Sequence, residues 1–232
     1  MLDFDKFTLL TFDCYGTLID WESGILDTLR GVVAQWGREL SDNEILSIYA
    51  DIEAEVESRT YMSYKDTLRT VMDRFGERLE CALDAGQRDC LVTALAGWPA
   101  FDDTVRSLLA LKKRYKLAVI SNTDDDLFAQ TARTLEVTFD WVVTAQQVGA
   151  YKPSAKNFEF ALAKTGVRRE QILHVAQSIY HDIVPAAAIG LSTVWVNRRG
   201  GQEGFGATRQ AAGTADLEVP DLAALVSIMG LE

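Results

Sequence analysis

The chain has 232 residues, of which 48% are hydrophobic and 25% are charged, a balance that excludes a largely disordered protein. Its formal net charge is −11, which opposes binding to nucleic acid or to anionic lipid, because both require clustered Lys and Arg side chains. A small anionic ligand remains compatible with this charge, because a local positive site outweighs the global field within a Debye length of about 8 Å.

The N-terminal segment MLDFDKFTLLTFD carries acids where a secretory signal would need basic residues, and no apolar run approaches the roughly 20 residues that span a bilayer. We therefore expect a cytoplasmic protein without a membrane partner. The three cysteines, Cys14, Cys81 and Cys90, are odd in number and lack metal-ligand spacing, which predicts neither disulfides nor a structural zinc site.

The first predicted strand, Leu9 to Cys14, is an apolar run that contains Asp13 near its end and is followed by Gly16. A carboxylate at the tip of a buried strand can face a pocket, where neighbouring N–H groups keep it ionised. Taken alone, an acid before a glycine is also typical of a solvated turn.

Residues 19–98 offer helical patterns and no convincing strand. Ser41 and Glu44 have capping-box spacing and begin an amphipathic stretch that runs to Ser58, and Tyr64 to Phe75 and Gln87 to Leu95 predict two further helices. Because this insert follows the first strand directly, we expect a helical cap domain over the carboxyl end of that strand, where open α/β sheets bind ligands. The core domain would then comprise residues 1–18 and 99–232.

Beyond the insert, strands and helices alternate. Strands are predicted at Leu117 to Ile120, Trp141 to Thr144, Ile172 to Ala176, Thr193 to Val196 and Leu217 to Val219. Helices are predicted at Asp103 to Tyr115, Asp126 to Leu135, Ala155 to Lys164 and Ile183 to Ile189. The alternation indicates an α/β fold, with a Rossmann-like parallel sheet and right-handed crossovers that place helices on both of its faces.

Three later segments, each at or just after the end of a predicted strand, complete a series that begins with Asp13. They are Ile120-Ser121-Asn122-Thr123, Lys152-Pro153 and Ser178 to Asp182. In this order the four segments resemble the motifs of the haloacid dehalogenase superfamily. The Tyr two positions after Asp13 resembles the 2-haloacid dehalogenase branch of that superfamily.

The resemblance implies that Asp13 is a nucleophile that forms a covalent ester with the substrate. Lys152, Asp182 and Thr17 would be the other catalytic residues. The Lys152 ammonium would keep Asp13 charged, and Lys152 with Asp182 would orient or activate the water that opens the ester. A Lys is otherwise most often a solvated surface residue.

The resemblance also assigns the substrate-binding residues. Ser121 would hold an anionic group of the substrate together with the N–H groups of Cys14 and Tyr15. Asn122 would support the leaving group or fix the nucleophile, and Ser178 lies in the fourth motif. Without the other motifs, Asn122 would read as a strand-end turn.

Two positions distinguish the phosphatases of this superfamily from its 2-haloacid dehalogenases. Phosphatase relatives carry a second Asp where this chain has Tyr15, and a phenol with a pKa near 10 is a poor acid for protonating a leaving oxygen. Gln177 stands where phosphatases supply a magnesium-binding Asp, and an amide is a weak ligand for that ion. Departure of a halide needs no proton, so we expect a dehalogenase that requires no cofactor. Magnesium would be needed only by a phosphatase.

The chain also departs from the dehalogenase pattern. Ile179 replaces an expected Asn, and Phe158 replaces an expected Tyr. The cap offers no clear counterpart of the Arg that contacts the halide; Arg38, Arg59 and Arg69 are the candidates. Other residues considered for the pocket are Trp21, Tyr61, Tyr64 and His181, whereas His174 is expected in the core.

The predicted activity is hydrolysis of a short 2-haloacid to a 2-hydroxy acid, or a related displacement at carbon such as opening of a strained carbon–nitrogen ring. A phosphatase acting on a small phosphomonoester and an inactive small-anion binder are the alternatives. The resemblance further implies a homodimer.

Overall fold

The computed structural model describes residues 2–202 and 204–231 and contains one six-stranded parallel sheet. The strands are β1 (Leu9–Phe12), β2 (Lys116–Ser121), β3 (Trp141–Thr144), β4 (Ile172–Ala176), β5 (Ser192–Val196) and β6 (Leu217–Val219). Their order is β3-β2-β1-β4-β5-β6. The predicted α/β fold with a parallel sheet is confirmed, and β1 ends two residues earlier than expected.

Strand β1 lies in the middle of the sheet, paired with β2 on one side and β4 on the other. Successive side chains of a strand point to opposite faces. Accordingly, Leu10 and Phe12 belong to a large apolar cluster, whereas Leu9 belongs to a second, smaller cluster with Ile120 and Phe158. A residue that follows β1 is therefore held by a strand buried on both faces.

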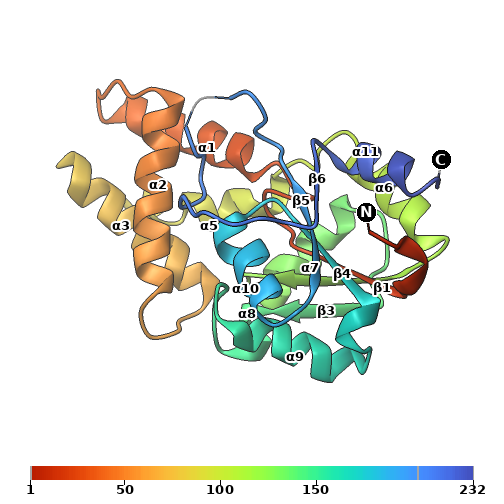
Figure 1. The fold of residues 1–232 in the computed structure, drawn as a ribbon. Helices are drawn as coiled ribbons and strands as arrows, with labels where there is room; N and C mark the ends of the chain where they lie inside the picture. Colours follow the sequence, from red (N-terminus) through yellow and green to blue (C-terminus); the bar gives the residue numbers. More distant parts are fainter. Residues whose placement is uncertain (1, 203, 232) are drawn as a thin grey trace.

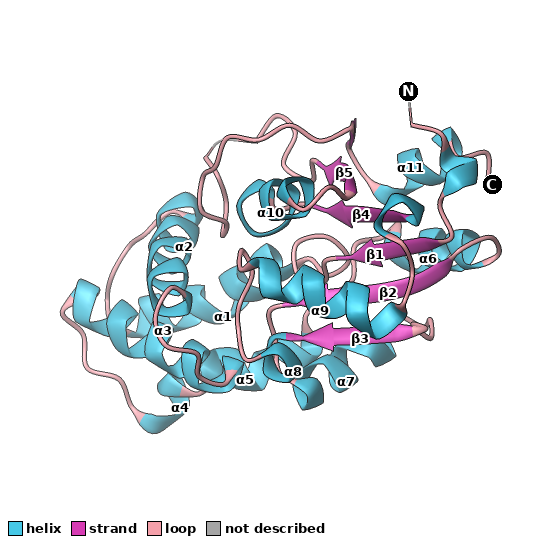
Figure 2. Ribbon diagram, turned by 60° about the horizontal axis from the view of Figure 1, so that its bottom comes forward, coloured by secondary structure: helices cyan, strands magenta, loops and turns pink. Residues whose placement is uncertain are grey.

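Helices cover both faces of the sheet (Figures 1 and 2). One face carries α9 (Ala155–Thr165) and α10 (Val184–Ala188), and the other carries α6 (Thr104–Lys112), α7 (Asp125–Thr134) and α11 (Leu222–Ile228). The short helix α8 (Ala145–Val148) follows β3, and a π-helical turn, η4 (Ile179–Ile183), follows β4. Two 3-10 turns, η1 (Phe4–Lys6) and η3 (Arg169–Gln171), precede β1 and β4.

The segment between β1 and α6 is helical. It contains α1 (Trp21–Gln35), α2 (Asp42–Glu57), α3 (Tyr64–Leu79), α4 (Ala85–Arg88), α5 (Cys90–Ala94) and the 3-10 turn η2 (Leu95–Gly97). The predicted capping box at the start of α2 is present, with Ser41 and Glu44 each satisfying a backbone N–H of the other. In Figure 1, α1, α2 and α3 lie beside the sheet rather than on its faces. The domain boundaries at residues 18 and 98 stay a prediction.

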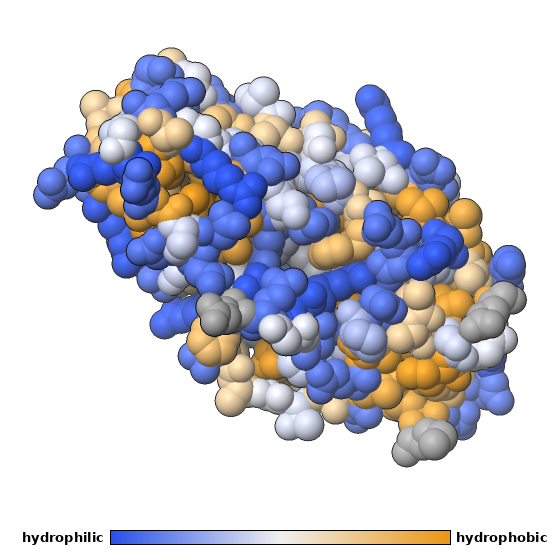
Figure 3. All heavy atoms as spheres, turned by 90° about the horizontal axis from the view of Figure 1, so that it is seen from above, coloured by the Kyte–Doolittle hydropathy of each residue, from blue (hydrophilic) through white to orange (hydrophobic). Residues whose placement is uncertain are grey.

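Figure 3 shows hydrophobic side chains in separate groups on one face of the molecule, with hydrophilic side chains between them. Among residues 2–202 and 204–231, four large apolar side chains are well exposed, Leu109, Val184, Phe205 and Ile228. None of the helices within residues 2–202 and 204–231 is long and apolar enough to cross a membrane.

Candidate active site

Asp13 directly follows the central strand β1. Its N–H donates to the carbonyl of Val175 on β4, and the residue is only 6% exposed. Gly16 turns the chain away from the strand with a φ of +92°, a conformation that side chains with a Cβ rarely adopt. A Cβ at this position would also lie 2.9 Å from Nε1 of Trp21. The turn thus places a buried carboxylate at the carboxyl edge of the sheet.

Lys152 is 1% exposed, and its ammonium group reaches the same edge. Nζ lies 2.8 Å from Oδ1 of Asp13 and 2.6 Å from Oδ1 of Asp182, and it donates to the carbonyl of Ile120 at 2.9 Å. An ammonium has three donors, and these contacts occupy all of them. One buried cation therefore serves two buried carboxylates.

The charges of this group are mutually dependent. Burial raises the pKa of Asp13 above its ordinary value, and attraction to Lys152 opposes that rise. Burial alone would also raise the pKa of Asp182, but attraction to Lys152 and the hydrogen bond from His174 outweigh it and lower that pKa. Burial alone would lower the pKa of Lys152, and the two carboxylates raise it instead. Lys152 and Asp182 are therefore charged at neutral pH.

His174, which lies on β4, forms a hydrogen bond with Asp182. Nε2 of His174 lies 3.0 Å from Oδ1 of Asp182, and Nδ1 lies 2.9 Å from Oγ1 of Thr11. Because an ionised carboxylate only accepts hydrogen bonds, the Nε2–H is the donor. The expected core location of His174 is confirmed, and its contact with Asp182 adds a positioning role. The other oxygen of Asp182, Oδ2, is buried without a hydrogen-bond partner among the described residues.

Thr17 supports the second oxygen of Asp13. Its hydroxyl donates to Oδ2 of Asp13 at 2.6 Å and accepts from the N–H of Gln177 at 2.9 Å. Both oxygens of Asp13 are thus fixed, one by Lys152 and one by Thr17, which orients the carboxylate.

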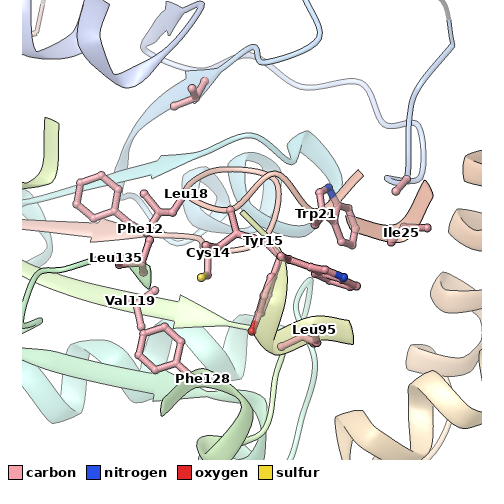
Figure 4. Close-up of a cluster of buried hydrophobic side chains, with 14 of the residues drawn as sticks. Phe12, Cys14, Tyr15, Leu18, Trp21, Ile25, Leu95, Val119, Phe128 and Leu135 are labelled. Atoms are coloured by element: carbon pink, nitrogen blue, oxygen red, sulfur yellow. The ribbon is translucent and has the colours of Figure 1, made fainter. Parts of the chain in front are cut away.

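Hydrogen-bond donors without a protein acceptor lie next to Asp13 in the described part of the chain. The hydroxyl of Ser121 is 1% exposed and has no hydrogen-bond partner in the described part of the chain. The N–H groups of Cys14 and Tyr15 donate to no acceptor within residues 2–202 and 204–231 either. Figure 4 shows the side chains of Cys14 and Tyr15 among buried apolar side chains. Backbone N–H groups and a hydroxyl in this arrangement suit a carboxylate.

The side chain of Tyr15 is used structurally. Its hydroxyl forms a 2.8 Å hydrogen bond with Thr131 on α7, and its ring packs edge-on against Trp98. Burial raises the pKa of Tyr15 further above its already high value. This phenol is therefore a still poorer acid than the sequence alone indicates.

The residues do not suit a magnesium ion bound in the phosphatase manner. The ammonium of Lys152 lies between the two carboxylates of Asp13 and Asp182, and Oε1 of Gln177 lies 3.4 Å from the hydroxyl of Thr208. No group of three or more His, Cys, Asp or Glu side chains within the described residues is arranged to hold a metal ion. A hard dication would need carboxylate oxygens where this site offers an ammonium and an amide.

The side chains of Asn122 and Ser178 form hydrogen bonds with backbone groups of nearby segments. The Asn122 side chain accepts from the N–H of Lys152 at 2.7 Å, and its amide nitrogen donates to the Lys152 carbonyl at 3.1 Å and to Oε2 of Glu57 at 3.2 Å. The Ser178 hydroxyl accepts from the N–H of His181 at 2.9 Å and so begins η4. Asn122 therefore fixes the segment that carries the buried ammonium group of Lys152.

A small cavity lies between the carboxyl edge of the sheet and the helical segment from α1 to η2, which we call the cap. Its walls comprise Asp13, Tyr15, Trp21, Glu53, Glu57, Tyr64, Ser121, Asn122, Lys152, Ser178, His181, Asp182 and Thr208. Most of the predicted site residues are therefore brought together, with Thr17 and Cys14 directly behind them. Trp21, Tyr64 and His181 line the cavity as considered, whereas Tyr61 instead packs on Tyr151.

The three arginine candidates do not line this cavity. Arg38 donates to the carbonyl of Leu79, Arg59 pairs with Glu55, and Arg69 pairs with two surface acids. The cap contributes Glu53 and Glu57 of α2 instead, which the sequence analysis did not single out. Their spacing of four residues is a signal that both belong to one helical face.

Comparison with known proteins identifies relatives of two activities. A family model described as a haloacid dehalogenase-like hydrolase matches residues 7–190. The (S)-2-haloacid dehalogenase 4A of Burkholderia cepacia is 27% identical over 207 residues, which cover 84% of this chain and 85% of that protein. A glyceraldehyde 3-phosphate phosphatase of Methanothermobacter thermautotrophicus is 30% identical over 193 residues, covering 80% of this chain and 84% of the phosphatase.

Among solved structures, the chain is similar to the L-2-haloacid dehalogenase of Xanthobacter autotrophicus, whose structure has chloropropionic acid covalently bound. The TM-score is 0.79 at 19% sequence identity, and the match covers 97% of this chain and 98% of the other. This similarity concerns the fold.

Proposed function

We propose that this chain, which belongs to the haloacid dehalogenase-like hydrolases, uses Asp13 as a nucleophile that displaces a leaving group from carbon. The substrate would be a short 2-haloacid and the product a 2-hydroxy acid. The observation that carries this proposal is the oriented Asp13 carboxylate, held at one oxygen by Lys152 and at the other by Thr17.

The proposed reaction has two steps. An oxygen of Asp13 attacks C2 in line with the carbon–halogen bond, and the halide leaves with the bonding electrons, so that an ester forms. Water then attacks the carbonyl carbon of that ester and gives up a proton to Asp182. As the bond between the carbonyl carbon and the original Asp13 oxygen breaks, that oxygen takes the proton back from Asp182 and leaves as the hydroxyl of the 2-hydroxy acid. Oδ2 of Asp182 has no partner among the described side chains and is the oxygen available to that water.

The surroundings would support each charge in turn. Ser121 and the N–H groups of Cys14 and Tyr15 would bind the substrate carboxylate. Lys152 would stabilise Asp13 before attack and the oxyanion during ester hydrolysis. Although burial opposes it, attraction to Lys152 lowers the pKa of Asp182, so this carboxylate is ionised at neutral pH and free to accept a proton from the attacking water.

We also propose that the reaction needs no metal. Lys152 supplies the positive charge between the carboxylates. Tyr15 has too high a pKa to act as an acid, and a leaving halide does not need one. The dehalogenase among the relatives supports this assignment, while the phosphatase relative keeps phosphomonoester hydrolysis as the alternative. The inactive anion binder, the homodimer and the cytoplasmic location stay predictions.

The test is incubation with 2-chloropropionate and with p-nitrophenyl phosphate, each with and without chelator, while chloride and phosphate are measured. We expect chloride release that survives the chelator and is lost in Asp13→Asn. The exposed Asp102 provides a matched control, Asp102→Asn, which should keep full activity. Magnesium-dependent phosphate release would instead establish the phosphatase, and binding without either product would establish the inactive binder.

A further inference from the structure

The cap side of the cavity is acidic. Glu53 and Glu57 project from one face of α2, four residues apart, into the cavity that contains Asp13. Glu53 is 3% exposed, and the side chain of Glu57 is 5% exposed. These acids are not surface charges. Burying a carboxylate costs free energy unless a partner compensates for the lost hydration.

Glu53 has one oxygen satisfied and one available. The hydroxyls of Tyr49 and Tyr64 both donate to Oε1, at 2.7 Å and 2.9 Å. No donor among the described residues reaches Oε2. Because tyrosine hydroxyls bring hydrogen bonds but no positive charge, they hold the carboxyl group in place without neutralising it.

Within the described residues Glu57 likewise has no Lys or Arg side chain at ion-pair distance, and Lys152 attracts it only from farther away. The amide of Asn122 donates to Oε2 at 3.2 Å, and Nε2 of His181 lies 3.6 Å from the same oxygen. Burial lowers the pKa of His181 to about 4, so this imidazole is neutral at pH 7. Both cap carboxyl groups therefore face the cavity without a positive partner from the described part of the chain.

The cavity as a whole has more acids than bases. Asp13, Asp182, Glu53 and Glu57 contribute four carboxyl groups, and Lys152 contributes the single ammonium group among the lining residues. That ammonium is fully engaged by Asp13, Asp182 and the Ile120 carbonyl. Burial raises the pKa of Glu53 to about 7 and that of Glu57 well above its ordinary value. A ligand carboxylate opposite these two acids would disfavour their charged forms further, whereas an ammonium group beside them would stabilise those forms.

On the sheet side of the same cavity, Ser121 offers a hydrogen-bond donor to an anionic group. The buried Ser121 hydroxyl has no hydrogen-bond partner and lines the cavity on the sheet side. An anionic group of a ligand would find hydrogen-bond donors on the sheet side of the cavity, and a cationic group would find carboxyl groups on the cap side. The rings of Trp21 and Tyr64 line the space next to the acids, and aromatic rings favour an ammonium group as a neighbour.

We infer that the substrate is a short zwitterion, a carboxylic acid with its leaving group on C2 and a protonated amine that binds against Glu53 and Glu57. This inference rests on the proposed function, since it assumes displacement by Asp13. It also explains the composition of the cap: an arginine facing Glu53 and Glu57 would pair with them and occupy the place of the substrate amine. Within the described residues the cavity wall holds no arginine.

Two isosteric substrates test the inference. 3-Amino-2-chloropropionate and 2-chlorobutanoate have the same number of heavy atoms and the same reacting carbon, and differ by an ammonium in place of a methyl group. We expect kcat/KM to be at least about 10-fold higher for the amino compound, the effect of one buried ion pair of modest strength. Glu53→Gln and Glu57→Gln should each reduce this ratio towards one.

The matched control is Glu55→Gln. Glu55 lies on the same helix but is exposed, where it pairs with Arg59 and Arg74. This variant should keep the wild-type ratio. A ratio that falls equally in all three variants would overturn the inference, because it would report only the loss of negative charge on α2.

Binding separates this inference from the proposed function. In Asp13→Asn, titration calorimetry should show tighter binding of 3-aminopropionate than of butanoate, with the difference lost on adding Glu53→Gln. Equal binding, or preferred turnover of 2-chlorobutanoate, would overturn the inference and leave the proposed function standing. If neither chloro acid loses chloride, the proposed function fails, and the calorimetric comparison still decides whether the cavity selects an ammonium group.

Discussion

The ammonium group of Lys152 lies 2.8 Å from Oδ1 of Asp13, although the two residues are 139 positions apart in the chain. The contact depends on both ends being fixed: Asp13 by the central strand, and the Lys152 backbone by the amide of Asn122. The same ammonium pairs with Asp182, so removal of its charge would leave two buried carboxylates without a cation.

Lys152→Met should therefore lower kcat by about 1,000-fold, because the ester intermediate loses its electrostatic support. It should also destabilise the protein by about 3–5 kcal/mol at pH 7, and by less at pH 5, where the carboxylates protonate more readily. Urea unfolding measures the stability, and steady-state formation of the 2-hydroxy acid measures kcat. Lys156→Met, at an exposed position nearby, is the control and should change neither. A Lys152→Met enzyme with near-normal turnover would refute the proposed role.

Ser121→Ala should raise KM by about 10-fold or more without loss of stability. The hydroxyl of Ser121 is buried and unpartnered, so its removal costs the fold no hydrogen bond, while the substrate carboxylate loses one. Ser107 on α6 also has a buried hydroxyl without a partner among the described residues, far from the cavity wall. Ser107→Ala should match Ser121→Ala in stability and differ from it in KM. Equal KM values for the two variants would argue against a binding role.

Glu53→Gln should become progressively more stable than the wild type as the pH rises from about 4.5 to about 7. Burial raises the pKa of Glu53 to about 7 from a usual value of 4.5, so between these values the native state binds more protons than the unfolded state and loses stability with rising pH. The groups that face it are Tyr49, Tyr64 and Glu57.

The size of the difference at pH 8 should be about 1–3 kcal/mol, and it should be constant above that pH. Urea unfolding of both proteins at pH 5 and pH 8 measures it. A difference that is the same at both pH values, or smaller at pH 8, would show that Glu53 is not held in a raised-pKa environment.

Chelation should leave dehalogenation unchanged. The positive charge between Asp13 and Asp182 is the ammonium of Lys152, and Gln177 offers no carboxylate. Chloride release measured after dialysis against a chelator should equal that of the untreated enzyme, and added magnesium should not increase it. Loss of activity that magnesium restores would contradict this account.

The sequence predicted the strands and the edge at which the site lies because buried strands have a simple pattern and parallel strands end at a common edge. Asp13, Ser121 and Lys152 each follow or end such a run, and they meet in the structure. The capping box of α2 could also be predicted from the sequence, because it depends on two residues only three positions apart.

The cap side of the cavity could not be predicted in the same way. Glu53 and Glu57 lie in a helix rich in acids, where a charge usually faces solvent, and only the position of α2 beside the carboxyl edge of the sheet turns them towards the cavity. His174 was expected as a core residue, and its bond to Asp182 depends on the register between β4 and the turn that follows it. The prediction that an arginine of the cap contacts the leaving group was wrong for the three candidates. Each of them binds a partner at the surface instead of turning towards the cavity.

The most direct test of the account is a single turnover of 2-chloropropionate by excess enzyme in water enriched in heavy oxygen, followed by mass spectrometry of the peptide that contains Asp13. If Asp13 forms the ester and water opens it at the carbonyl, one heavy oxygen enters Asp13 and the first molecules of lactate carry none. Label in the lactate, with an unlabelled Asp13 peptide, would mean that water attacks the substrate directly, and it would contradict the covalent mechanism.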